Sequence, residues 1–414
     1  MNTSHRLILG TILLAACTAA VAAQNAATDW PQWRGPRRDG TLSTFSEPKV
    51  WPDTLTQQWK INVGEGYSTP ILVGNRVYQF SRQGENEVMR AIDAATGKVI
   101  WEQPYPAVYQ MNNSTSRHGP GPKSTPTFAG GRLFTLGMTG RVTAFDANSG
   151  KEVWQKPGTP VQPNFHTAMS PIVDGGNMIL HVGGHNDGAL TAFDTATGAV
   201  KWTWTGDGPA YGSPIIAEIG GTRQVVVFSQ RNLVGVNAAD GQLLWSVPFE
   251  ARSTTNSITP LVYGGNTLIV SGQGKPLTSY IVANKGSKWV ADLAWENPAI
   301  QMSFSNAVIV GDAIFSMSPL NSGQFFWADA KTGKTLWLSE PRQAGNAAIT
   351  RSGDLLFVLK DNGELMVGKA APGVAFTPTK TYTVAMSATW APPVISGNRI
   401  FVKDVDTLAL WTLN

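Results

Sequence analysis

The chain has 414 residues, of which 42% are hydrophobic and only 14% are charged, and its formal net charge is +4. This length allows a large buried core, in one big domain or two ordinary ones. Nucleic-acid binding needs a concentrated basic stripe, and because Lys and Arg form no such block, a nucleic-acid partner is not expected. The 43 Gly and 26 Pro residues predict many turns between short strands, as in an all-β protein.

The N-terminus has the features of an export leader. Two charge-bearing residues, His5 and Arg6, precede the apolar run LILGTILLAAC, which is too short to span a membrane. Two cleavage sites are compatible with it. LAAC has the form of a lipobox, in which Cys17 is lipidated and tethers the chain to a membrane surface, whereas ordinary signal peptidase would cut after Ala23. The sequence predicts a signal peptide over 1–16, with an alternative end at 23. Cys17 is the only cysteine, so the folded part contains no disulfide.

Residues 17–50 are predicted to form an N-terminal arm. The arm carries Trp30 and Trp33 in the Pro- and Gly-rich stretch DWPQWRGPRRDG. Two interpretations of this stretch are open: a strap packed on the following domain by its two Trp rings, or a peptide that docks on a partner.

One phrase recurs along the rest of the chain, as AIDAATGKVIW, AFDANSGKEVW, AFDTATGAVKW, GVNAADGQLLW and WADAKTGKTLW. The Trp residues that end these phrases and their degenerate copies are separated by 42 to 53 residues. A β-rich repeat of this length indicates a propeller with four strands per blade. Within each phrase, Asp is expected to accept hydrogen bonds from turn N–H groups, and Gly to adopt a positive φ. The terminal Trp is expected to fill the wedge between neighbouring blades.

Each blade also has a front phrase, such as STPILVGNRVYQF, in which two apolar runs flank a Gly-Asn or Gly-Gly hairpin turn. Eight front strands are predicted, and they begin near Ser68, Ser124, Met169, Gly212, Ile258, Ser305, Asn346 and Ala391. The chain ends in the third strand of the eighth blade. We expect the fourth strand to come from LTQQWKINV around Trp59, because an open ring would leave a bare strand edge. The sequence thus predicts an eight-bladed β-propeller over 51–414, closed by pairing of its N-terminal strand with the C-terminal blade.

The phrase A-x-D-x-x-T-G-x-x-x-W resembles the PQQ-type propeller repeat family, and five clear copies carry the resemblance over residues 51–414. One branch of this family, the quinoprotein dehydrogenases, holds pyrroloquinoline quinone and Ca²⁺ in the propeller mouth. The other branch is similar to BamB, the propeller lipoprotein of the outer-membrane β-barrel assembly machinery, which has eight blades, a lipobox and no quinone. The chain matches the second branch in size and lipobox. The stretches DWPQWRGPRRDG and SRHGPGPKSTP also resemble a large bacterial group of exported propellers. Fold alone does not determine function.

Binding is expected on one face of the propeller. The repeated D-x-x-T-G turns share the opposite face, whereas irregular loops, where binding sites usually lie, collect on this one. The positions three residues before the front Pro, or equivalent to it, should circle the channel mouth, and they are Tyr67, Lys123, Ala168, Tyr211, Ser257, Phe304, Gly345 and Trp390. Their aromatic members either plug the channel or form a stacking platform for a planar or sugar-like ligand. The candidate ligand-binding residues are Tyr67, Arg117, His118, Lys123, His166, Tyr211, Asn256, Phe304 and Trp390.

Neither a metal nor a cofactor is expected. The loop histidines His118, His166 and His185 match no compact metal motif, and His181 is assigned to a strand. In the dehydrogenase branch the quinone commonly stacks on a vicinal disulfide, which a single cysteine cannot form, and Ca²⁺ needs a carboxylate cluster. On the predicted mouth face we find only Asp187 and Asp361 as isolated acidic candidates.

The sequence therefore favours an exported, lipid-anchored and monomeric propeller scaffold that binds a protein partner or ligand in the cell envelope. Its expected location is the periplasm or the periplasmic side of the outer membrane. The alternative is a PQQ-dependent oxidoreductase, with PQQ and Ca²⁺ bound, or another small-molecule-binding enzyme with its site at the propeller mouth.

Overall fold

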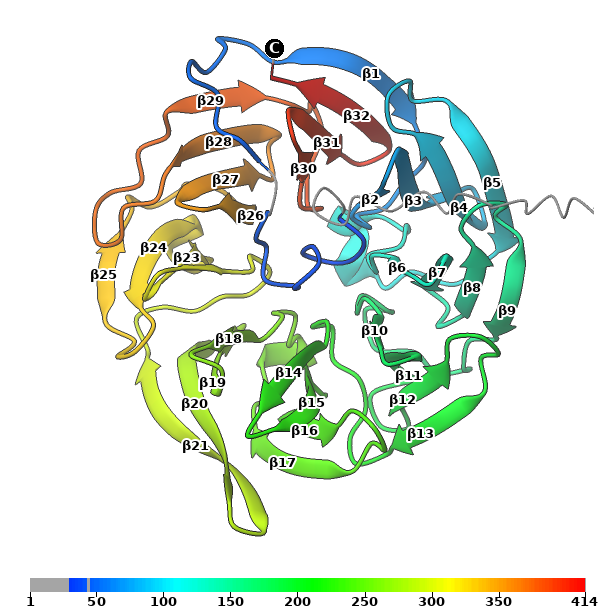
Figure 1. Ribbon diagram of the computed structural model, residues 1–414, viewed down its shortest axis with the longest axis vertical. Coiled ribbons are helices and arrows are strands. Elements are labelled where there is room, and N and C mark those ends of the chain that lie inside the picture. The colour runs from blue at the N-terminus through cyan, green and yellow to red at the C-terminus, as the bar shows by residue number, and fades with distance from the viewer. Residues whose placement is uncertain (1–29, 43–44, 414) are drawn as a thin grey trace, which may run out of the picture.

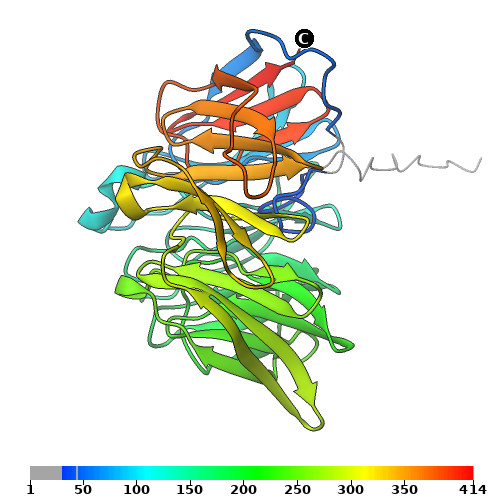
Figure 2. The same cartoon turned by 90° about the vertical axis from the view of Figure 1, so that its left-hand side faces the viewer.

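The computed structural model describes residues 30–42 and 45–413, so the predicted leader and Cys17 lie outside the described residues. Eight four-stranded antiparallel sheets stand radially around a central channel (Figure 1). The predicted eight-bladed propeller is therefore confirmed. Seen from its edge, the ring is a thick disc, and the three short 3-10 helices lie on one of its two faces (Figure 2).

In blades one to seven the chain runs from an innermost strand at the channel to an outermost strand at the rim, whereas the outermost strand of blade eight is β1 (Figure 1). The strands of blades one to four are β2 Ile71–Val73, β3 Arg76–Gln83, β4 Asn86–Asp93 and β5 Val99–Pro106; β6 Thr127–Ala129, β7 Arg132–Leu136, β8 Val142–Asp146 and β9 Glu152–Lys156; β10 Ile172–Asp174, β11 Asn177–Val182, β12 Ala189–Asp194 and β13 Val200–Trp204; β14 Ile215–Ile219, β15 Thr222–Phe228, β16 Asn232–Asn237 and β17 Leu243–Pro248.

The strands of blades five to eight are β18 Leu261–Tyr263, β19 Thr267–Gly272, β20 Lys275–Lys285 and β21 Lys288–Asn297; β22 Val308–Val310, β23 Ala313–Ser318, β24 Gln324–Asp329 and β25 Thr335–Leu338; β26 Ala347–Ser352, β27 Leu355–Lys360, β28 Glu364–Lys369 and β29 Lys380–Thr383; β30 Val394–Ser396, β31 Arg399–Lys403, β32 Thr407–Thr412 and β1 Thr56–Asn62. The 3-10 helices are η1 Asn113–His118, η2 Arg252–Thr254 and η3 Leu320–Ser322. We call the face that carries these helices and the blade-to-blade connections the loop face, and the opposite one the turn face.

The ring is closed by strands from the two ends of the described chain. Strand β1 pairs antiparallel with β32, in a register that runs from Thr56 opposite Thr412 to Asn62 opposite Thr407. The predicted closure is thereby confirmed. It gives the eighth blade its fourth strand and covers the outer edge of β32.

The repeated aspartates form turns, as predicted. The Asp93 carboxylate accepts hydrogen bonds from the backbone N–H groups of Ala95 and Thr96 and from the Thr96 hydroxyl, at 2.8–3.1 Å. These hydrogen bonds hold the pKa of Asp93 below its ordinary value, because they favour the charged form. Equivalent bonds are made by Asp146, Asp194 and Asp329.

The Trp that ends a phrase docks on the turn of the following blade. The Trp154 indole N–H donates to the Thr195 carbonyl at 3.0 Å, and a Cβ added to Gly198 would lie only 2.7 Å from the Trp154 ring. The same pairing joins Trp59 to Gly97, Trp101 to Gly150, Trp202 to Gly241 and Trp295 to Gly333. The prediction that Trp fills the wedge between blades is confirmed. It also explains why Gly and Trp recur together: this Gly combines a positive φ with close ring contact.

A belt of hydrogen bonds joins the first blades around the channel. The Thr69 N–H donates to the Thr125 hydroxyl, Thr125 N–H to the Ser170 hydroxyl, and Ser170 N–H to the Ser213 hydroxyl, at 2.9–3.1 Å. Each of these residues directly precedes a front Pro. The belt was not predicted, although Ser or Thr at that position in five blades was a readable signal for it.

Residues 30–42 of the arm cross the central channel (Figure 1). Trp30 exchanges backbone hydrogen bonds with Leu72 of blade one, and the Pro31 carbonyl accepts from Phe128 of blade two. At the other end, the Leu42 N–H donates to the Arg351 carbonyl of blade seven. The arm thus connects blades that lie on different sides of the ring.

Two buried arginines fix the middle of the arm. Arg34 and Arg38 are each 2% exposed. Arg34 donates to the Ala307 carbonyl at the start of blade six at 2.5 Å, whereas Arg38 donates to the Pro171 and Pro214 carbonyls at the start of blades three and four. Burial lowers the pKa of Arg34 to about 10 and that of Arg38 to about 9, so both guanidinium groups remain charged at neutral pH.

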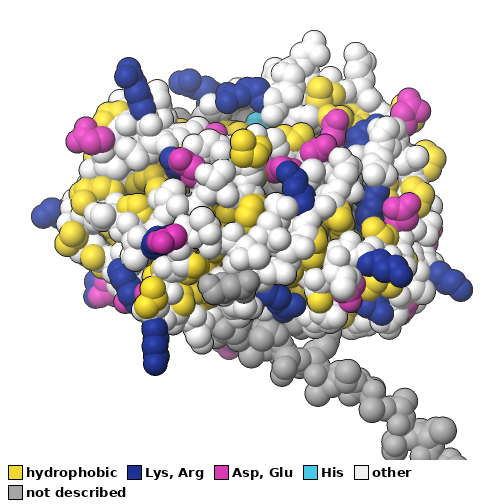
Figure 3. Space-filling view, turned by 90° about the horizontal axis from the view of Figure 1, so that it is seen from above, with side chains coloured by type: hydrophobic (Ala, Val, Ile, Leu, Met, Phe, Trp, Pro, Cys, Tyr) yellow, Lys and Arg dark blue, Asp and Glu magenta, His cyan; other side chains and the backbone are white. Residues whose placement is uncertain are grey.

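The rim of the disc carries mixed charge. In the view of Figure 3, basic and acidic side chains are interspersed rather than gathered by sign. In the part of the chain that the structure describes, no helix is long and apolar enough to cross a membrane.

Candidate functional site

The central channel opens on the loop face into a cavity of about 320 Å³, which we call the mouth cavity. Its lining contains seven of the eight positions that the repeat alignment placed at the mouth, namely Tyr67, Lys123, Ala168, Tyr211, Ser257, Phe304 and Trp390. The eighth position, Gly345, lines an adjoining cavity that shares Phe304 and Trp390 with the first. Equivalent residues of successive blades therefore converge on one site, as the geometry of a ring requires.

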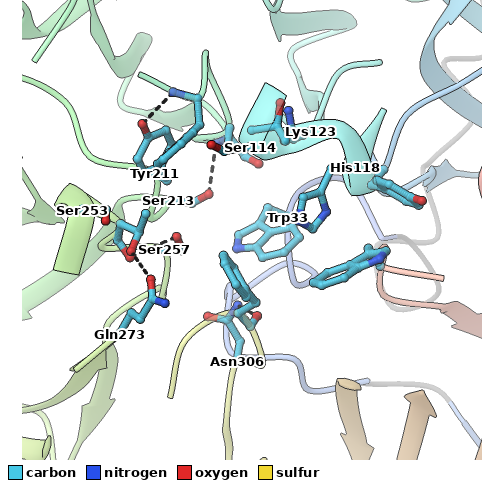
Figure 4. Close-up of a pocket in the computed structure, with 18 residues that line it drawn as sticks. Trp33, Ser114, His118, Lys123, Tyr211, Ser213, Ser253, Ser257, Gln273 and Asn306 are labelled. Atoms are coloured by element: carbon cyan, nitrogen blue, oxygen red, sulfur yellow. Dashed lines mark hydrogen bonds between the residues drawn. The ribbon is translucent and has the colours of Figure 1, made fainter. Parts of the chain in front are cut away.

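One side of the mouth cavity is aromatic. The His118 and Trp390 rings meet edge to face, with centroids 4.4 Å apart, and Phe304 lies 5.9 Å from Trp390. Tyr67 lies 6.3 Å from His118, again edge to face. The inward side is formed by Trp33 of the arm, whose indole N–H donates to the Thr259 hydroxyl of blade five at 2.8 Å (Figure 4). The arm is thus part of the cavity wall.

The other side of the mouth cavity is polar. The Tyr211 hydroxyl accepts a hydrogen bond from the Phe165 N–H at 3.1 Å and lies 3.3 Å from His185 Nε2. Burial raises the pKa of Tyr211, so the phenol stays protonated. The hydroxyls of Ser213 and Ser257 face the same space (Figure 4). This arrangement offers hydrogen-bonding groups opposite the aromatic side.

The charge in the mouth is positive. Lys123 Nζ is enclosed and has no hydrogen-bond partner in the described part of the chain. Burial lowers the pKa of Lys123 to about 8, so its ammonium form still predominates at neutral pH. Burial lowers the pKa of His118 to about 4, and the charges of Lys123 and Arg117 act in the same direction, so His118 is neutral there. Among the described residues, no Asp or Glu lines the mouth cavity or the adjoining one.

Three candidate residues lie outside the mouth cavity. Arg117 lines the adjoining cavity. His166 is half-buried beside Tyr109, with ring centroids 4.4 Å apart, and its Nε2 lies 3.0 Å from the Gln110 carbonyl. Asn256 is fully buried, and its side-chain amide donates to the Phe249 carbonyl at 2.7 Å. His166 and Asn256 therefore do not line the mouth cavity or the adjoining one.

Several residues of the mouth were not among the candidates from the sequence. They are Trp33, Gln273, Asn306 and the serines and threonines that line the polar side. The hydroxyl residues before the front Pro gave a signal for Ser170 and Ser213, which line the cavity. For Trp33 the sequence held no such signal, because only the path of the arm through the channel brings it to the mouth.

Backbone strain is concentrated in the arm and on the loop face. The described residues other than Gly with a positive φ are Arg34, Arg38, His166, Ser253, Thr254, Asn321, Ser322 and Arg342. The last six belong to loop-face connections. Such conformations cost about 1–3 kcal/mol each and tend to occur at functional sites. The strain therefore points to the same face as the cavity does.

The residues present do not suit a quinone site with Ca²⁺. In the described chain, no group of three or more His, Cys, Asp or Glu side chains is placed to hold a metal ion. Ca²⁺ takes six to eight oxygen ligands, many of them carboxylate, and the described lining of the mouth offers hydroxyl and amide oxygens but no carboxylate. As predicted, His181 lies on a strand, β11, where it is buried.

Radial four-stranded blades with D-x-x-T-G turns and a mouth on the loop face define a propeller of the PQQ-repeat class. Over residues 84–339 the chain matches the family described as "Outer membrane protein assembly factor BamB", and it belongs to that family. One relative, the outer membrane protein assembly factor BamB of Burkholderia pseudomallei, is 26% identical over 422 residues, with 94% of this chain and 95% of the relative covered.

Quinone-dependent dehydrogenases are also related to the chain. It is 30% identical over 186 residues to the dehydrogenase subunit of alcohol dehydrogenase (quinone) from Acetobacter aceti, but this covers 38% of the chain and 24% of that protein. Among solved structures, BamB from Moraxella catarrhalis aligns with a TM-score of 0.58 and 15% identity, covering 87% of this chain and all of that one. Quinohemoprotein alcohol dehydrogenase ADHIIG from Pseudomonas putida HK5 aligns with a TM-score of 0.63 and 14% identity. This alignment covers 94% of the present chain and 80% of the dehydrogenase chain. The two structural matches bear on the fold alone.

Proposed function

We propose that the protein is an exported propeller scaffold of the cell envelope that binds a partner protein through its loop face. The observation that carries the proposal is a set of large apolar side chains that the described chain leaves uncovered. Val108 is 67% exposed, Phe304 45% and Met386 88%. Each lies in the connection from the outermost strand of one blade to the innermost strand of the next. Single exposed apolar residues are ordinary, but several in equivalent connections of one face suit a contact surface.

The relatives support the same proposal. The alignment covers 95% of that outer membrane protein assembly factor, whereas the alignments to quinone dehydrogenase subunits cover 24% of one and 46% of another. A scaffold also agrees with a mouth that lacks the carboxylates of a calcium-bound quinone site. The proposal includes lipidation of Cys17, a location in the periplasm or on the periplasmic side of the outer membrane, and a monomeric propeller.

The loop-face contact can be tested by site-specific photo-crosslinking in cells. A photoreactive amino acid at Met386 or Val108 should give discrete crosslinked products with an envelope protein. Val374 is the matched control, because it is 59% exposed but lies in the connection between β28 and β29 on the turn face. Products of equal yield from Val374, or none from Met386 and Val108, would contradict the proposal.

Two further measurements separate the alternatives. Turnover of alcohols or sugars by the purified chain with pyrroloquinoline quinone and Ca²⁺ would favour the oxidoreductase. The anchor is tested with Cys17→Ser, which should release the protein from the membrane fraction. Unchanged membrane association of that variant would count against lipidation.

A further inference from the structure

The mouth holds a positive charge that the chain leaves unmatched. Lys123, Arg117 and Arg252 line the mouth cavity and the adjoining one, and no acidic residue of the described chain joins them there. Enclosing an ammonium group without a hydrogen-bond acceptor is unfavourable by several kcal/mol. Lys123 Nζ is nevertheless enclosed and has no acceptor in the described chain. Because Nζ is closed off from solvent, an acceptor from another molecule reaches it only when the flexible lysine side chain turns into the mouth cavity that it lines.

The same cavity offers aromatic surfaces on two sides. Trp33 forms the inward wall (Figure 4). Phe304 and Trp390, which also line the cavity, meet edge to face. A volume of about 320 Å³ lies at the lower end of the range for ligand cavities, roughly 300–1,000 Å³. Buried aromatic anchors in such pockets contribute much of the binding energy of protein interfaces. The size and lining of the cavity therefore suit one aromatic side chain and the polar group next to it.

The cavity is continuous with the proposed contact surface. Phe304 belongs both to the cavity lining and to the exposed apolar residues of the loop face. An occupant that covers those residues also passes over the mouth. This continuity favours a segment of a protein over a free small molecule.

We propose that the mouth cavity receives an aromatic side chain and an adjacent carboxylate from an extended segment of the partner protein, with Lys123 donating to that carboxylate. Trp33, Phe304 and Trp390 contact the aromatic ring, and Arg117 and Arg252 attract the acidic segment to the rim. The inference rests on the proposed partner-binding function and names the chemistry of the partner's segment.

The test is a selection of random nonapeptides displayed on phage against the purified mature chain, with prior depletion on the Lys123→Met variant. The expected outcome is a consensus with an aromatic residue next to Asp or Glu. A synthetic peptide of that consensus is then titrated by calorimetry. Charge-assisted hydrogen bonds in enclosed sites correspond to about tenfold or more in affinity, so Lys123→Met should weaken binding by at least that factor.

The controls separate binding from folding. Lys151→Met removes an exposed lysine from a turn-face turn and should leave peptide affinity unchanged. Removal of an unpaired buried charge does not destabilise a protein by itself, so Lys123→Met should melt no lower than the wild type. The peptide with Gln in place of its acid should bind the wild type about as weakly as the acidic peptide binds Lys123→Met. Phe304→Ala, at a partly exposed position, tests the aromatic contact independently.

The inference is overturned by a consensus without an acidic or an aromatic residue, or by equal affinity of the peptide for the wild type and Lys123→Met. It is also overturned if free phenylacetate or indole-3-acetate competes at the concentration of the peptide itself, which would mark a small-molecule site. If crosslinks form at Met386 and Val108 while no peptide enters the mouth, the partner-binding function stands and this inference fails.

Discussion

Replacement of Arg38 tests whether the arm holds the propeller together. Arg38 donates to the carbonyls of Ser170, Pro171 and Pro214, which belong to the starts of blades three and four. In Arg38→Met the apolar stem is kept, but these buried carbonyl oxygens lose their charged donor. Each unsatisfied buried acceptor costs about 1–3 kcal/mol, and the removed charge recovers part of this, so we expect a net loss of about 4 kcal/mol.

This loss can be measured as a shift in thermal unfolding. With an unfolding entropy of about 2.1 cal/mol/K per residue, a loss of about 4 kcal/mol in a domain of this size lowers Tm by about 5 °C. Arg37 is the matched control, because it is the neighbouring arginine and its guanidinium lies exposed beside Asp39 at 3.1 Å. Arg37→Met should stay within about 1 °C of the wild type. Equal melting of the Arg38→Met variant and the wild type, by circular dichroism at matched concentration, would refute the role of the arm.

Three further predictions concern the blades. Deletion of residues 51–64 removes β1, and the truncated chain should aggregate; a soluble monomer with wild-type melting, by light scattering and calorimetry, would refute closure by β1. Gly198→Ala should lower the free energy of unfolding, measured by chemical denaturation, by at least about 1 kcal/mol more than Gly175→Ala does. Both positions have a positive φ, but only Gly198 would place a Cβ against the Trp154 ring. Equal losses in the two variants would contradict the docking of Trp154. Burial lowers the pKa of His181 to about 4 in the folded protein, whereas it is about 6.5 in the unfolded chain. Between these two pH values the unfolded state binds more protons than the folded state. The free energy of unfolding should therefore fall as pH decreases from about 6.5 to about 4. His181→Leu should reduce the slope of that dependence, to which His118 contributes in the same direction, and an unchanged slope would exclude His181 as a source.

The blades could be predicted from the sequence because each depends on a phrase that local chemistry explains. The Asp turn, its Gly and the docked Trp repeat in order, and their spacing indicated a propeller. The eight front strands predicted the number of blades, and the end of the chain in a third strand predicted the N-terminal closing strand. The ring of mouth residues followed from the same alignment, since equivalent positions in a closed ring must converge. Tyr67, Tyr211 and Trp390 reach one cavity for this reason.

The interior of the channel could not be predicted in this way. In the sequence, Arg34 and Arg38 stand in a polar, Pro- and Gly-rich stretch typical of an exposed loop. Their burial depends on carbonyl groups supplied by blades that are distant in the sequence, which no local pattern encodes. The orientation of the Asn256 side chain could not be predicted either. The alignment placed this residue near the mouth, but its amide donates to the buried Phe249 carbonyl.

The closing strand pair has a consequence for how the chain folds. Thr56 and Thr412, which face each other across it, are 356 positions apart. Bringing such distant segments together carries an entropic cost of about 5 kcal/mol, and contacts of such long sequence separation slow folding. Residues 30–42 contact blades from the first to the seventh. Their insertion into the channel therefore shortens the loop that must be closed when β32 pairs with β1. We therefore expect the N-terminal segment to act as an internal template for assembly, and a nascent chain to remain vulnerable to proteases until its final residues emerge.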